Sequence, residues 1–147
     1  MILIDIENLM ASPDPATNEV EVVVDALRNV VPGFDYDQKV VAYSHHAAHT
    51  VPFAFPTARH LWRSGPDGAD LALREVLENE RVDERFECVT ICSGDGIFAS
   101  TTAWLAHSGV EVTAVSLSGH LAARLQVAAR HVTLIPVTPS IAVGTAS

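Results

Sequence analysis

Basic residues are scarce in this sequence: nine Lys and Arg stand against 18 Asp and Glu, and the formal net charge is −9. Broad, sequence-independent affinity for nucleic acid depends mainly on Lys and Arg, so the composition argues against a protein that coats DNA or RNA. It leaves a nuclease open, because a metal site is itself acidic and its bound cation reverses the local field. For such an enzyme, the charge predicts a small footprint on RNA.

Cysteine is limited to Cys88 and Cys92, which lie within a run that predicts a buried strand. Four strand residues span roughly 13 Å, which is more than a disulfide can bridge. We therefore expect no disulfide framework. Both cysteines should instead act as small buried hydrophobic side chains.

Long apolar runs are also lacking. Histidines and prolines interrupt the longest uncharged stretch, residues 40–58, whereas a bilayer helix needs roughly 20 predominantly apolar residues. At the N-terminus, no basic region precedes a long apolar run. We therefore expect no secretory signal, no membrane association and a cytoplasmic location.

The chain instead has strands that alternate with helices. Short apolar runs predict strands at 1–5, 39–43, 58–62, 87–92, 110–115 and 132–135. Helical spacing predicts helices that begin at Asp14-Pro15, at Asp67-Gly68, at Ile97 and at Ser118. This alternation is typical of an α/β fold with a mostly parallel sheet and helices on both faces. We expect one domain over residues 1–136 and a loose tail over residues 137–147.

Three aspartates fall where such a fold places its ligands. Asp5 ends the first strand, Asp95 follows the strand at 87–92, and Asp70 lies in the first turn of a helix. Ligands in parallel sheets bind at the carboxyl ends of the strands, near the switch in strand order. Carboxylates 4 Å apart repel by roughly 4 kcal/mol at an effective dielectric near 20, and Mg²⁺ or Mn²⁺ would relieve this. Alternatively, the three are a solvated strand end, a charge favoured at a helix start and an ordinary turn residue.

Three motifs around these aspartates resemble the NYN family of nucleases, within the PIN-like superfamily. They are Ile4-Asp5-Ile6-Glu7-Asn8-Leu9, Gly68-Ala69-Asp70-Leu71-Ala72-Leu73 and Cys92-Ser93-Gly94-Asp95-Gly96-Ile97-Phe98. They occur in the family's order and at family-like spacing. The resemblance implies a three-layer PIN-like or Rossmann-like domain.

The resemblance also implies roles for individual residues. Asp5, Asp70 and Asp95 would bind the metal, Mg²⁺ or Mn²⁺, and carry catalysis. Asn8 would orient Asp5 or contact the phosphate, and Ser93 would do similar work beside Asp95. Many relatives have a second aspartate two residues after the Ser-Gly-Asp aspartate, where this chain has Ile97. The loss of that carboxylate predicts weaker metal binding or slower turnover.

Candidate phosphate contacts come from the few cations. Arg63 and Arg59 precede the helix that carries Asp70, so we expect them to grip the RNA backbone. Arg74 lies four residues after Asp70 and could pair with it. His45, His46 and His49 resemble a loose metal cluster, but a polar loop is the better interpretation. Trp62 and Trp104 could stack on bases, although core packing suits Trp104 better.

The expected function is metal-dependent endoribonuclease activity on RNA, with a homodimer or a regulatory protein as possible further partners. One alternative is a catalytically weak or inactive module that binds RNA or protein, which Ile97 and the net charge favour. Another is a phosphohydrolase resembling the haloacid dehalogenase group, since Asp5-Ile6-Glu7 and Gly94-Asp95-Gly96 loosely match its motifs. That enzyme needs a catalytic lysine, and Lys39, the only lysine, opens a strand.

Overall fold

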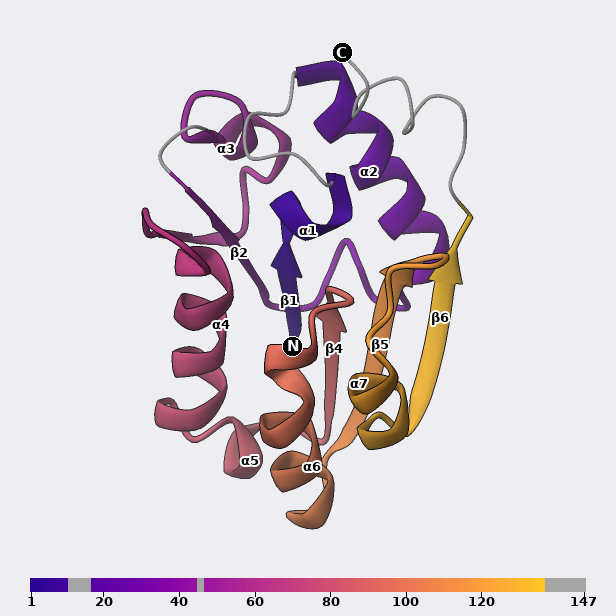
Figure 1. Ribbon diagram of the computed structural model, residues 1–147. Helices are drawn as coiled ribbons and strands as arrows, with labels where there is room; N and C mark the ends of the chain where they lie inside the picture. The colour runs from indigo at the N-terminus through magenta and orange to yellow at the C-terminus, as the bar shows by residue number, and fades with distance from the viewer. Residues whose placement is uncertain (11–16, 45–46, 137–147) are drawn as a thin grey trace.

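A six-stranded sheet forms the centre of the computed structural model, which describes residues 1–10, 17–44 and 47–136 (Figure 1). The strands are β1 (Ile2–Asp5), β2 (Lys39–Tyr43), β3 (Arg59–Trp62), β4 (Cys88–Cys92), β5 (Glu111–Leu117) and β6 (His131–Ile135). Their order is β3-β2-β1-β4-β5-β6, and every neighbouring pair is parallel. The predicted α/β fold with a parallel sheet is therefore confirmed.

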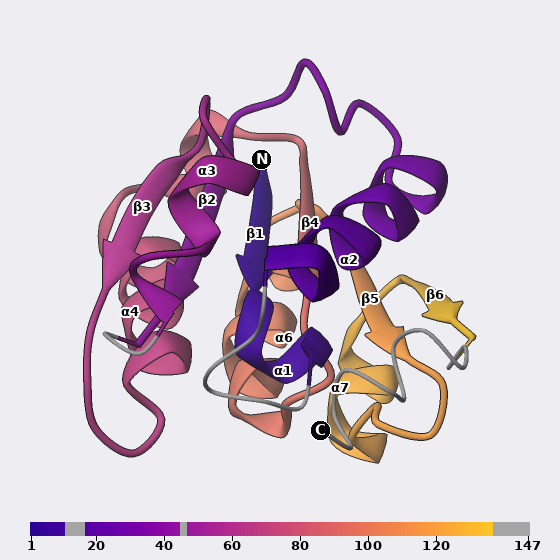
Figure 2. The ribbon, with the colours of Figure 1, turned by 90° about the horizontal axis from the view of Figure 1, so that it is seen from above.

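Seven α-helices and one 3-10 turn are described around the sheet. They are α1 (Ile6–Met10), α2 (Thr17–Val30), α3 (Val51–Ala54), α4 (Gly68–Asn79), α5 (Val82–Arg85), the 3-10 turn η2 (Gly96–Phe98), α6 (Ala99–His107) and α7 (Ala123–Ala128). Figure 2 shows α2 and α3 on one side of the sheet and α4, α6 and α7 on the other. The molecule thus has three layers.

The short strand β1 lies in the middle of the sheet. All four of its residues are buried, and it pairs with β2 on one side and β4 on the other. Successive side chains of a strand point to opposite faces, so Ile2 and Ile4 join the core under α2, while Leu3 joins the core under α4 and α6. An apolar run without alternation is what a strand covered on both faces requires.

Four helices differ from the prediction, and two of them, the four-residue helices α3 and α5, were not expected. The five-residue helix α1 follows β1 directly and was not expected from the sequence. Ser118 does not cap the last helix, because β5 continues to Leu117 and the chain then turns through Gly119, whose φ is +82°. The helix α7 starts only at Ala123, where the N–H of Ala122 donates to the Gly94 carbonyl at 2.9 Å.

Two expected core residues are exposed. Cys88 is the first residue of β4 and is exposed at the amino end of the strand, so only Cys92 is buried. Both cysteines are free, as expected. Trp104 is 41% exposed, because α6 buries Thr101, Thr102 and Leu105 instead. The prediction of core packing for Cys88 and Trp104 was wrong.

Several expectations fall on residues outside the described ranges. These are the Asp14-Pro15 helix start, His45, His46 and the tail 137–147. Within the described ranges, none of the helices has both the length and the apolar composition that a membrane span would need.

Candidate metal centre

The three predicted aspartates meet at the carboxyl ends of β1 and β4, where the strand order reverses. Asp5 is the last residue of β1 and only 2% exposed. Its Oδ1 accepts the backbone N–H of Asn8 at 3.3 Å, because α1 begins at the next residue and turns that amide back toward the strand end. Its Oδ2 faces the hydroxyl of Ser93, the donor at 3.5 Å. Asp5 is thus fixed from both sides.

The turn after β4 carries Asp95 and is tied to α1. The Asn8 side-chain oxygen accepts the Gly94 N–H at 2.9 Å. Ser93 Oγ accepts the Asp95 N–H at 3.2 Å, and Asp95 Oδ1 accepts the Ile97 N–H at 2.9 Å, which caps η2. The turn therefore sets the direction of the Asp95 carboxylate, which also hydrogen-bonds to Asp70.

Gly94 allows that turn to pass close to the β5–α7 connection. A Cβ at this position would overlap the His120 carbonyl oxygen and the Ser116 hydroxyl. Since a carbonyl oxygen of the backbone cannot move aside alone, only glycine fits here.

Asp70 and Asp67 come from the start of α4. Asp67 precedes the helix with φ at 56°, a left-handed backbone that turns its side chain toward the helix start. One carboxylate oxygen from each of Asp67, Asp70 and Asp95 lies within 4.8 Å of the other two. Asp70 is 8% exposed and also hydrogen-bonds to Asp5. Four acids therefore share this corner of the sheet.

Crowding and burial change how these acids hold protons. The pKa of Asp70 rises to about 10, chiefly because the side chain is buried and then because Asp5 and Asp95 lie beside it. Burial also raises the pKa of Asp5, whereas the hydrogen bonds from Asp70 and from the Asn8 backbone act against that rise. The two behave as a coupled pair in which protonated Asp70 donates to the Asp5 carboxylate.

A small pocket of about 160 Å³ opens over the acids. Its lining is Asp5, Glu7, Asn8, Gly65, Asp67, Gly68, Ala69 and Asp70. Glu7 is held at one wall, where its Oε1 accepts the Ser44 N–H at 2.7 Å. Carboxylate and amide oxygens line the pocket, and no histidine or cysteine does. Hard divalent cations prefer oxygen ligands of this kind.

The predicted polar and acidic site residues are brought together, whereas the predicted arginines are engaged elsewhere. Asp5, Asn8, Asp70, Ser93 and Asp95 form one connected group. Arg63 donates from both terminal nitrogens to Glu75, at 2.9 and 2.7 Å, and Arg59 pairs with Glu80. Arg74 pairs with Glu78 at 2.8 Å, not with Asp70 as the spacing had allowed.

Two residues near the site were not among the expected ones. The Asp67-Gly68 pair predicted only a helix start, although the separation of Asp67 and Asp70 by three residues is the signal that could have paired them. Arg124 of α7 lies against Gly96, the residue after Asp95. No sequence motif surrounds Arg124, so only the fold reveals its position.

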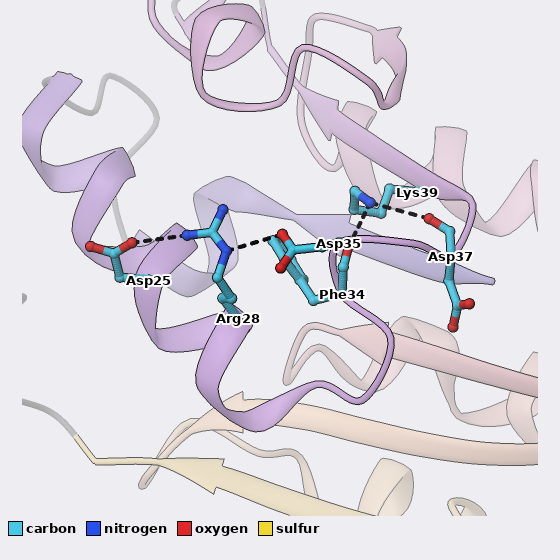
Figure 3. A network of polar contacts seen from close by, with 6 residues as sticks. All are labelled: Asp25, Arg28, Phe34, Asp35, Asp37 and Lys39. Carbon is cyan, nitrogen blue, oxygen red and sulfur yellow. Dashed lines mark hydrogen bonds and ion pairs between the residues drawn. The ribbon is translucent and has the colours of Figure 1, made fainter.

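Lys39 lies at the opposite end of the sheet. Its Nζ donates to the carbonyl oxygens of Phe34 at 2.6 Å and Asp37 at 3.1 Å, next to the Asp25–Arg28–Asp35 ion pairs (Figure 3). Lys39 opens β2 at its amino end, whereas the acids lie at the carboxyl ends of the strands. The only lysine therefore cannot serve these acids.

Comparison with known proteins gives a fold neighbour and no family. No protein-family model matches the chain, and no curated protein matches it. A crystal structure of a Vibrio parahaemolyticus protein of unknown function is similar, with a TM-score of 0.57 over 95% of this chain and 92% of that one. The two chains are 13% identical, so the similarity shows the fold alone. The resemblance to NYN nucleases therefore remains a hypothesis from the motifs.

Proposed function

We propose that the protein is a metal-dependent endoribonuclease that uses Mg²⁺ or Mn²⁺. The observation that carries the proposal is the acidic corner formed by Asp5, Asp67, Asp70 and Asp95 at the switch in strand order. Buried carboxylates at this separation repel one another by roughly 3.5 kcal/mol per ionised pair at an effective dielectric near 20. A bound cation would remove this repulsion and so stabilise the folded protein.

The residues present fit a hard cation. Asp67, Asp70 and Asp95 each offer one oxygen, and these three oxygens lie within 4.8 Å of one another. Asp5 hydrogen-bonds to Asp70. When bound there, such an ion would lower the pKa of a water nucleophile and offset charge on a phosphodiester. The specificity for RNA in this proposal rests on the NYN-like motifs.

The protein's own groups have separate roles in the proposal. In the metal-free protein the Asp5 carboxylate accepts a hydrogen bond from protonated Asp70 and so keeps the Asp70 side chain oriented. The Ile97 N–H holds one oxygen of Asp95, so the carboxylate needs no rearrangement when its other oxygen binds. Asn8 keeps the turn after β4 against α1, which fixes the separation between Asp5 and Asp95.

Ile97 bears on whether the site is active. The second carboxylate that many NYN nucleases carry at this position is missing, but Asp67 supplies another carboxylate to the cluster from the start of α4. We propose that Asp67 compensates for the missing ligand. A module that binds RNA without cleaving it is the second candidate, favoured by Ile97 and by the net charge of −9.

The direct test is cleavage of a 5′-labelled single-stranded oligoribonucleotide with Mg²⁺ or Mn²⁺. The Asp95→Asn variant should lose cleavage by at least about a hundredfold, because a metal ligand supplies transition-state stabilisation. Asp83→Asn in α5 is the matched control and should cleave as the wild type does. A wild type that binds the metal but leaves the RNA intact would support the second candidate, and equal cleavage by Asp95→Asn would refute the site.

Two further tests complete the proposal. Hydrolysis of small phosphate esters without cleavage of RNA would favour the phosphohydrolase alternative, although the position of Lys39 argues against it. The proposal also includes a cytoplasmic location, which the two free cysteines are consistent with. Localisation of a tagged full-length protein by microscopy would test it.

A further inference from the structure

The arginine Arg124 differs from every other cation of the protein. Eight of the nine Lys and Arg side chains bind a carboxylate or a backbone carbonyl, namely Arg28, Lys39, Arg59, Arg63, Arg74, Arg81, Arg85 and Arg130. Within the described ranges, Arg124 makes no such hydrogen bond or ion pair. In a protein with twice as many acids as bases, an arginine left without a carboxylate is unusual.

The fold holds this guanidinium against Gly96, the residue that follows Asp95. A Cβ on Gly96 would overlap Arg124 Nε and would lie 2.8 Å from Cζ and Nη2, so the guanidinium lies directly against the backbone of the residue after Asp95. The N–H of Ala122, just before α7, donates to the Gly94 carbonyl at 2.9 Å. This bond holds the start of α7 against the turn that carries Asp95, and so fixes the position of the Arg124 backbone.

The guanidinium lines a second pocket, separate from the acidic one. The pocket measures about 360 Å³ and is lined by Arg74, Gly96, Ile97, Ala99, Ser100 and Arg124. Arg74 and Arg124 come from different helices, α4 and α7, and both reach this pocket at the start of α6. Arg74 shares its charge with Glu78, so Arg124 supplies most of the positive potential.

We propose that this Arg124 pocket binds a backbone phosphate of single-stranded RNA, next to the phosphodiester that faces the acids. The proposal rests on the proposed ribonuclease function. The planar guanidinium offers paired N–H donors that match two phosphate oxygens, and no aromatic side chain in the pocket lining offers a surface on which a base could stack. The subsite also explains how so acidic a protein could hold RNA beside four aspartates.

The test compares RNA cleavage and RNA binding by the wild type, Arg124→Gln and Arg130→Gln. Arg130 pairs with Glu111 at the amino end of the sheet, so its variant makes the same change of charge away from the site. Arg124→Gln should raise KM roughly tenfold, which is the usual effect of losing a hydrogen bond to a charged group. Its kcat should stay within about twofold, because the contact is made equally before and during the reaction.

The salt dependence of binding gives an independent readout. Each phosphate neutralised on a single strand contributes about 0.7 to the slope of log K against log salt. Arg124→Gln should lower the slope by about that amount, and Arg130→Gln should leave it unchanged. The oligoribonucleotide used for cleavage serves as the probe.

Gly96→Ala tests position without a change of charge. The new methyl group displaces only the end of the Arg124 side chain, and Gly96 lies outside the left-handed backbone region, so the variant should fold. It should raise KM in the wild type and add nothing in the Arg124→Gln background, since both changes act on the same contact.

The outcomes separate the two proposals. If the wild type cleaves RNA and Arg124→Gln behaves as Arg130→Gln does, the phosphate subsite is refuted while the ribonuclease proposal stands. A fall in kcat with KM unchanged would also refute the subsite, because the guanidinium would then act on the reacting phosphate. If the wild type neither binds nor cleaves RNA, both proposals fail.

Discussion

Replacing Asp70 with asparagine should stabilise the metal-free protein. Asp70 is buried against Asp5 and holds a proton, with a pKa of about 10 in the folded protein. Asparagine has the same shape as the protonated acid, and its amide can still donate to Asp5. The variant therefore keeps the hydrogen bond and removes the need to bind a proton on folding.

The size of this effect depends on pH. Near pH 4 and below, both the folded and the unfolded protein keep the proton, so Asp70 carries no penalty. As the pH rises toward about 10, only the unfolded chain releases it, and each pH unit costs the wild type up to about 1.4 kcal/mol. At pH 7 the upper limit is about 4 kcal/mol. Water at the exposed Asp67 screens the cluster, so we expect roughly 2 kcal/mol, or about 6 °C in Tm.

Thermal unfolding with a chelator at pH 4.5, 7 and 9 measures the effect. The Tm advantage of Asp70→Asn should be small at pH 4.5 and should grow at each step. The control Asp83→Asn, at a partly exposed residue of α5, should show no such trend. With Mn²⁺ at about a hundred times its Kd, the wild type should gain about 2.7 kcal/mol and the variant much less. An advantage that is absent, or constant with pH, would refute the assignment of a buried, proton-holding Asp70.

Four other substitutions test the packing and the hydrogen bonds of the structure. Gly94→Ala should destabilise the protein by about 3 kcal/mol in urea unfolding, because its methyl group meets the His120 carbonyl. Gly96→Ala, where only a flexible side chain is in the way, should cost far less. Asn8→Ala should cost about 1.5 kcal/mol, because the Gly94 N–H loses its acceptor, and an unchanged midpoint would contradict that. Thr102→Val should raise stability by about 1 kcal/mol, since the Thr102 hydroxyl is buried without a partner among the described residues. A lower Tm would show that this hydroxyl is satisfied.

The sequence predicted the fold because each strand carries its own pattern. The apolar run at 1–5 indicated a strand buried on both faces, and β1 has that position. The helix α1 was missed because five residues directly after a strand give no cap and too little periodicity. The start of α7 was missed because Ser118 looks like a cap, whereas the left-handed turn at Gly119 depends on how far β5 extends.

The acidic site was predicted from strand ends, while its cations were not. Asp5 and Asp95 follow neighbouring parallel strands, so topology alone brings them together. Which carboxylate each arginine pairs with depends on the elements that pack together in the folded protein. Arg63 meets Glu75 and Arg59 meets Glu80 because α4 packs beside β3, and no local spacing reveals this. The phosphate contact expected from Arg63 and Arg59 stays a prediction, and would require breaking these ion pairs.

The central position of β1 has a consequence for synthesis of the chain. Its partner β2 begins at Lys39, but its other partner β4 begins only at Cys88. At about 5–20 residues per second, these 49 positions separate the two partners by roughly 2–10 s. During that time the emerging chain has Asp5, and later Asp70, but neither β4 nor Asp95. If the assembled acids cut RNA, the growing chain cannot cut the message being read until β4 has joined the sheet.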